Sequence, residues 1–111
     1  MDYSQLSDQE INMLVAKIQH PDKTFIESKT RPPSVVLLNH INMWIDYCNN
    51  PADAWPIIQA NGICIGYDGI SWDASCHLHD IGQINDWKNH PEKPLRMAMI
   101  VYLLIQESKH A

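Results

Sequence analysis

The block DYCNNPADAWPII, at residues 46–58, marks the change from a strand to a helix more clearly than any other part of the chain. Asn50 can accept a hydrogen bond from a free backbone amide of a first helical turn, and Pro51 suits the first helical position because proline has no amide hydrogen. The carboxylate of Asp53 favours the positive end of the helix dipole. The block therefore predicts a short helix that ends at Gly62, where glycine tolerates a left-handed conformation.

Two longer helices are predicted near the ends of the chain. Ser7 and Glu10 form a capping box, and apolar residues then recur at helical spacing until Pro21 stops the pattern. A second helix is predicted from about residue 94 to residue 109. It is apolar nearly all round over residues 97–105, which implies contacts on more than one face. This last helix is therefore expected to be the central element of the fold.

Four strands are predicted between these helices. Residues 35–38 are a β-rich run, and residues 41–47 alternate between apolar and polar side chains, so the two runs can form a hairpin. Residues 63–65 and 71–76 flank an Asp-Gly pair, which is a typical hairpin turn. The intervening segments, residues 20–34 and 77–93, show no periodicity and are predicted to be connectors.

The predicted fold is a single α+β domain over residues 1–111. Its elements follow the order helix, strand, strand, helix, strand, strand, helix. Because hairpin connections join antiparallel strands, we expect a small antiparallel sheet of about four strands, in two hairpins, with about three helices packed on one face.

Composition limits the classes of function. With 8 Lys and Arg against 13 Asp and Glu, the net charge of −5 argues against a general nucleic-acid binder, which needs cations to displace phosphate counterions. The longest apolar run is about half as long as a membrane span requires. Three cysteines without paired spacing imply neither a disulfide framework nor a zinc ribbon. We therefore expect a cytoplasmic protein with no membrane partner.

Three stretches resemble the NinX-like family of lambdoid phages and prophages. They are MDYSQLSDQEIN at residues 1–12, the block at residues 46–58, and PLRMAMIVYL at residues 94–103. The resemblance implies a small accessory protein in the cytoplasm of a bacterial host. It carries over no catalytic residues, because none are established for that family.

Histidines provide one candidate site. His77 and His79 lie two residues apart, so on an extended segment they would project to the same side, and His90 or Cys76 could supply a third ligand. The hypothesis is a zinc-binding or metal-dependent hydrolytic module. Against it, the spacing matches no familiar zinc pattern, and exposed loop histidines are the commoner case. The main expectation is therefore that the chain has no cofactor.

Two further alternatives have weaker support. Cys48 precedes a predicted helix and could act as a nucleophile with His40 or His77, although a buried cysteine is more often a small core residue. A nucleic-acid contact would draw on the basic residues near the first connector, and the overall charge opposes it. Those residues are Lys17, His20, Lys23, Lys29 and Arg31.

Protein binding is the function that the sequence favours. Trp44 falls on the polar side of its strand, and tryptophan commonly anchors protein interfaces. Asn49 precedes the capping residue and is not needed for the helix start. Met97 and Tyr102 represent the surplus apolar faces of the last helix. We predict a non-enzymatic module that uses these four residues to bind a protein partner or a second copy as a homodimer, whereas Trp55 and Trp72 are expected in the core.

Overall fold

The computed structural model describes residues 2–109 and contains three α-helices and two three-stranded antiparallel sheets within that range. The helices are α1 (Asp8–Gln19), α2 (Pro51–Asn61) and α3 (Pro94–Lys109). The first sheet contains β1 (Thr24–Glu27), β2 (Val35–Leu38) and β3 (Met43–Ile45). The second contains β4 (Cys64–Tyr67), β5 (Trp72–Cys76) and β6 (Ile81–Asn85). Two 3-10 turns, η1 (Tyr3–Gln5) and η2 (His77–His79), complete the described elements.

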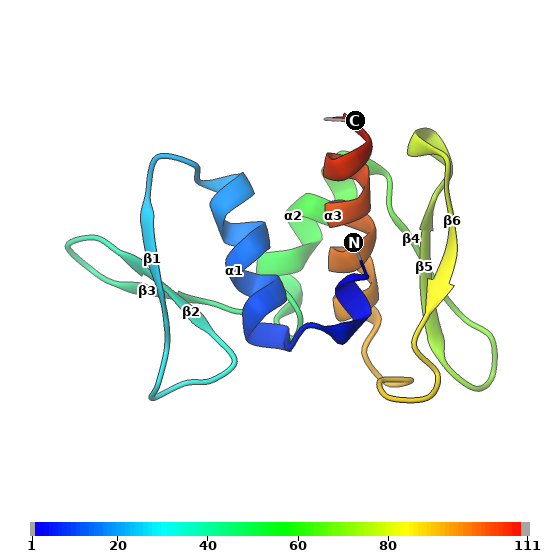
Figure 1. Cartoon of the computed structure of the whole chain (residues 1–111), viewed down its shortest axis with the longest axis horizontal. Helices are drawn as coiled ribbons and strands as arrows, with labels where there is room; N and C mark the ends of the chain where they lie inside the picture. Colours follow the sequence, from blue (N-terminus) through cyan, green and yellow to red (C-terminus); the bar gives the residue numbers. More distant parts are fainter. Residues whose placement is uncertain (1, 110–111) are drawn as a thin grey trace.

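The helices lie between the two sheets (Figure 1). The sheet β1-β2-β3 packs against α1, whereas β4-β5-β6 packs against α3 on the far side of the molecule. The α+β class is therefore confirmed. The single sheet of about four strands, with helices on one face, is wrong, because α3 separates the two predicted hairpins and each hairpin gains a third strand.

Both additional strands lie in the segments that were predicted to be connectors. β1 has one half-buried side chain, Phe25, among exposed ones, so it lacks the alternation that signals a strand. In β6 the two inward isoleucines are three residues apart, yet Ile84 pairs with Ala74 and Ile81 pairs with Cys76 because a bulge shifts the register. A bulge of this kind breaks the period of two on which sequence interpretation depends.

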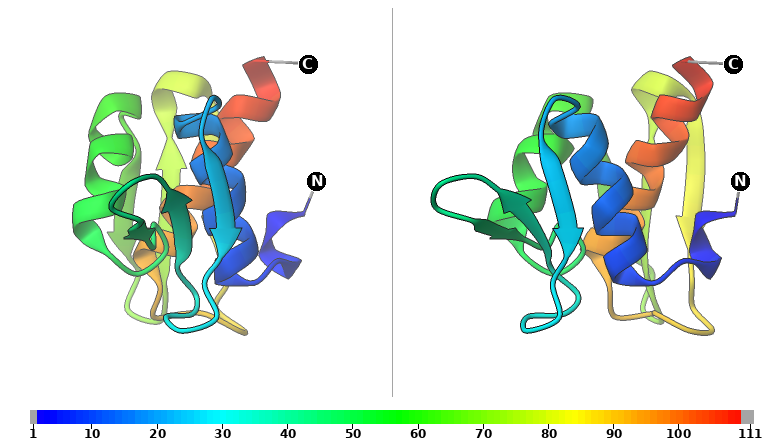
Figure 2. Two further views of the ribbon diagram at one scale, coloured as in Figure 1. Left: turned by 90° about the vertical axis from the view of Figure 1, so that its left-hand side faces the viewer. Right: turned by 60° about the vertical axis from the view of Figure 1, so that its left-hand side comes forward.

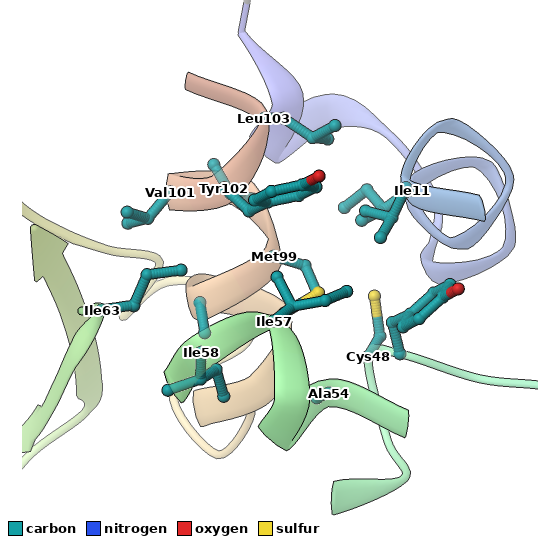
Figure 3. Close-up of a cluster of buried hydrophobic side chains, with 14 of the residues drawn as sticks. Ile11, Cys48, Ala54, Ile57, Ile58, Ile63, Met99, Val101, Tyr102 and Leu103 are labelled. Atoms are coloured by element: carbon teal, nitrogen blue, oxygen red, sulfur yellow. The ribbon is translucent and has the colours of Figure 1, made fainter. Parts of the chain in front are cut away.

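Helix α3 is the central element, as the sequence predicts. Its side chains from Arg96 to Leu103 are all buried. Figure 3 shows Met99 on the side of α3 that faces α1 and α2, and Val101 on the side of Ile63, the residue before β4. Each face of this helix thus has its own neighbour, which explains an apolar sequence without a polar side.

Neither of the two tryptophans expected in the core is fully buried. Trp55 is 56% exposed, and Trp72 is half-buried. The buried stripe of α2 consists instead of Ala54, Ile57 and Ile58, at helical spacing of three and four, and Trp55 lies outside it. The prediction that Trp55 lies in the core is therefore wrong.

We predict that Met99→Ala lowers the free energy of unfolding by about 2–5 kcal/mol, because it leaves a cavity between tightly packed helices. Trp55→Ala, which removes a larger but exposed side chain, should cost less than about 1 kcal/mol. Urea unfolding followed by circular dichroism measures both. A larger loss for Trp55→Ala than for Met99→Ala would contradict the described core.

Candidate functional site

The first turns of the three helices lie on the same side of the molecule (Figure 1). There, charged and amide side chains from α1, from the turn before α2 and from the start of α3 form one hydrogen-bonded group, which we call the polar cluster. Its members are Asp8, Asn12, Asp46, Asn49, Lys93 and Arg96.

Asp8 is the centre of the polar cluster. Its Oδ1 accepts a hydrogen bond from Arg96 Nη1 at 2.7 Å, and its Oδ2 accepts from Lys93 Nζ and from Asn49 Nδ2. Burial alone would raise the pKa of the Asp8 carboxyl, but hydrogen bonds from Lys93 and Arg96 outweigh it and lower this pKa. The carboxylate therefore stays ionised at neutral pH. It lies at the N-terminus of α1, where the helix dipole favours a negative charge.

Arg96 is fully buried and ties the start of the chain to α3. Its Nη2 donates to the carbonyl oxygens of Ser4 at 3.1 Å and Leu6 at 2.7 Å. Its Nε has no hydrogen-bond partner among residues 2–109. The guanidinium thus holds the segment before α1 in place while it neutralises Asp8.

Asn12 joins the turn before α2 to the first helix. Its side-chain amide donates to Asp46 Oδ1 at 2.8 Å and to the carbonyl of Pro33 at 3.1 Å, and its oxygen accepts from the backbone amide of Cys48 at 3.0 Å. Asn12 is fully buried, and these bonds use its donors and its acceptor. It therefore acts as a cross-link between α1, the residues before β2 and the turn after β3.

Cys48 does not have the environment of a nucleophile. Burial raises the pKa of its thiol well above the ordinary value, and the nearby Asp8 carboxylate acts in the same direction. Its hydrogen bonds go to backbone and side-chain atoms of Asp8 and Asn12. Because the reactive form of cysteine is the thiolate, this arrangement opposes the sequence hypothesis of a Cys48–His pair.

The three candidate metal ligands lie outside the strands, at opposite ends of the second sheet. His77 and His79 belong to η2, and His90 belongs to the loop that follows β6, which lies at the opposite end of that sheet (Figure 1). Across residues 2–109, no three His, Cys, Asp or Glu side chains are arranged so that they could hold a metal ion. The structure does not bring these histidines together, and metal binding stays a prediction.

The four residues predicted to bind a partner have four different settings. Trp44 is exposed, with the Arg31 guanidinium 4.2 Å from its ring centroid. Asn49 is exposed, but its amide bonds to Asp8 and Asp46.

Met97 and Tyr102 are 1% and 4% exposed, and the Tyr102 hydroxyl accepts a hydrogen bond from Gln19. This corrects the interpretation of α3. Its apolar faces are covered by α1, α2 and the sheet β4-β5-β6, so Met97 and Tyr102 are not exposed.

No local sequence pattern predicts the polar cluster, although one signal of it is present. Lys93 and Arg96 are cations at the start of a helix, where the dipole disfavours positive charge. Such residues need an anion close by, and Asp8 supplies it from 88 residues away along the chain. The separation explains why no local pattern reveals the pair.

The sequence from residue 2 to residue 106 matches the family described as Bacteriophage P22, NinX. The chain belongs to the NinX family. No curated protein and no solved structure matches it. Within residues 2–109, every helix is too short or too polar to span a membrane.

The polar cluster joins the three stretches that resemble the NinX family. Asp8 and Asn12 come from the first stretch, Asp46 and Asn49 from the second, and Arg96 from the third. Segments far apart in the sequence thus meet through one set of hydrogen bonds. The cluster uses most of its polar atoms internally, so its chemistry is that of a structural core with one exposed amide, Asn49.

We predict that Arg96→Met lowers the free energy of unfolding by about 3–5 kcal/mol, because it leaves Asp8 partly unpaired in a buried site. Lys93→Ala removes the other cation from the same carboxylate, but its side chain is 26% exposed against 1% for Arg96, so the loss should stay below about 1 kcal/mol. Denaturant unfolding at neutral pH compares the two variants. Equal losses would contradict the central role of Arg96.

Proposed function

We propose that this NinX family member is a non-enzymatic protein-binding module in the cytoplasm of the bacterial host, and that it binds through the outer face of the β1-β2-β3 sheet. One observation carries the proposal. The register places Ile26, Val36 and Trp44 opposite one another across the three strands, on the face that turns away from α1. We call this row, together with the neighbouring Leu38, the outer row.

The outer row has the exposure of a contact surface. Trp44 is 40% exposed and Ile26 is 49% exposed, whereas Val36 lies buried between them. Figure 2 shows the sheet in front of the helices, with no other described element over it. Large apolar side chains gathered on one sheet face are uncommon on a monomer's surface unless they bind something.

Arg31 adds the chemistry of an interface anchor. Its guanidinium stacks over the Trp44 ring at 4.2 Å, so both side chains are already held together before a partner arrives. Tryptophan and arginine are the residue types most enriched among interface hot spots. Pre-positioning also reduces the entropy that these side chains would lose on binding.

A second copy of the chain is the simplest partner. In a two-fold dimer the same sheet face would meet itself, so the outer row would be buried on both copies. The polar cluster supports a binding role over catalysis, because Asp8 and Arg96 form an ion pair with each other.

We predict that light scattering after size exclusion shows a dimer of the untagged protein at high micromolar concentration, and that Trp44→Ser shifts it to monomer. Trp55→Ser is the matched control, since it removes a tryptophan of similar exposure from α2 and should leave the dimer intact. A wild-type protein that stays monomeric contradicts the self-association form.

A foreign partner is tested with a photo-crosslinking residue at position 44 or at position 55, expressed in the host. A protein crosslinked from position 44 alone supports binding through the outer row. Equal crosslinking from both positions, or none from either, contradicts it.

A further inference from the structure

Two neighbouring clefts are lined by residues of the β4–β5 hairpin and of the loop that follows β6. Figure 1 shows the turn of this hairpin and this loop at the same end of the second sheet. The first has a volume of about 280 Å³ and is lined by Asp68, Ile70, Ser71, Asn85 and Trp87. The second has a volume of about 210 Å³ and is lined by Tyr67, Ile70, Trp72, Pro91 and Glu92. Ile70 lines both, so the two clefts share this side chain as a wall.

Hydrogen bonds hold the frame of the clefts. Asp68 Oδ1 accepts from the backbone amides of Ile70 at 2.8 Å and Ser71 at 2.9 Å, which fixes the hairpin turn. The amide of Trp72 donates to the carbonyl of Pro91 at 2.9 Å, which ties the loop to the hairpin. The walls are therefore positioned without any ligand.

The walls of the clefts are apolar and open to solvent. Ile70 is 73% exposed, and Tyr67 and Trp87 are each more than half exposed. The rings of Tyr67 and Trp72 contact each other with centroids 5.1 Å apart. Each cleft thus offers the face or edge of an aromatic ring beside the aliphatic side chain of Ile70.

The polar groups of the clefts are acceptors suited to a cation. Asp68 lines one cleft and Glu92 lines the other. The hydroxyl of Ser71 is buried and has no hydrogen-bond partner among residues 2–109. Lys88 lies 5.4 Å from the Trp87 ring centroid, so this ring already attracts an ammonium group of the chain itself.

Acidic side chains outnumber basic ones in this part of the chain. On the hairpin turn and the loop that form the clefts, Asp68, Asp86 and Glu92 stand against Lys88 and Lys93. Lys93 is already paired with Asp8. The surroundings of both clefts therefore favour a positively charged occupant.

We propose that these clefts bind a basic, extended segment of a protein partner, with one arginine or lysine side chain in each cleft. Side chains two residues apart on an extended segment point the same way. Because the two clefts share Ile70 as a wall, two such side chains can enter them together. The aliphatic stems pack on Ile70, and the cationic groups meet an aromatic ring and a carboxylate. This surface is separate from the outer row.

Other occupants fit less well. A nucleic acid would bring phosphates towards Asp68 and Glu92, which repel them. A second copy of the chain offers Lys29 and Arg31 two residues apart, but Arg31 is held over Trp44. The charge of the clefts therefore points to a basic segment from a different protein.

The four tryptophans make the test specific. In ¹⁵N-labelled protein each indole N–H gives its own signal, assigned with Trp→Phe variants, and the probe is the blocked peptide Gly-Arg-Ser-Arg-Gly. We expect saturable shifts of the Trp72 and Trp87 signals, with those of Trp44 and Trp55 unchanged. The same peptide with neutral citrulline for arginine should produce none.

Three results would overturn the proposal. Unchanged Trp72 and Trp87 signals would show that the clefts take no basic segment. Similar shifts of all four indoles would show diffuse attraction. Equal binding of the citrulline peptide would show that charge is not recognised.

Variants then test the named groups. The pair Asp68→Asn and Glu92→Gln should weaken peptide binding by about tenfold or more, since it removes both carboxylates while an oxygen remains at the hairpin turn. Glu27→Gln, in β1, is the control and should change nothing. Lys88→Gln should tighten binding about two- to threefold by removing a competing cation. Affinity unchanged in the double variant contradicts the assignment.

A second copy as the occupant would show itself without peptide. The Trp72 and Trp87 signals would then shift with protein concentration, and Lys29→Gln with Arg31→Gln would abolish the effect. That result would replace the foreign segment with the chain itself.

Discussion

The ion pair between Asp8 and Arg96 is the constraint on which the rest of the structure depends. Taking a guanidinium out of water costs several kcal/mol unless its hydrogen bonds are replaced. Here Asp8 and the carbonyls of Ser4 and Leu6 replace those of the two terminal nitrogens, Nη1 and Nη2. The pair can form only when α1, the segment before it and the first turn of α3 are all in place. Its geometry therefore couples the two ends of the chain.

The position of α3 follows from this coupling and determines which surfaces are free. Helix α3 has one side against α1 and α2 and the other against β4-β5-β6. Within residues 2–109, no element covers the outer face of either sheet (Figures 1 and 2). The large apolar side chains of the chain thus lie in two kinds of place. Most of them fill the core around α3, and the remainder lie on strands and hairpins, where the outer row and the two clefts are found.

Local signals predicted the elements whose chemistry is local. The Ser7–Glu10 capping box, the Asn50 cap and the left-handed Gly62 are all present as expected. Non-local features escaped prediction for physical reasons. Most side chains of β1 are exposed, so its sequence does not alternate between apolar and polar residues. In β6 a bulge changes the spacing of the two inward isoleucines. In α2 the buried stripe begins at Ala54, and the neighbouring Trp55 lies outside it. Of the candidate site residues, Trp44 lies at the surface as expected, whereas Met97 and Tyr102 are buried against neighbouring elements of the fold.

A double-mutant cycle of Asp8→Asn and Arg96→Met measures how strongly these two side chains depend on each other for stability. The free energies of unfolding of the wild type, both single variants and the double variant give the coupling between the two side chains. If the pair joins the ends of the chain, the losses are far from additive, with a coupling of at least about 1 kcal/mol. Additivity within about 0.5 kcal/mol would show that the two residues act independently and would contradict the account.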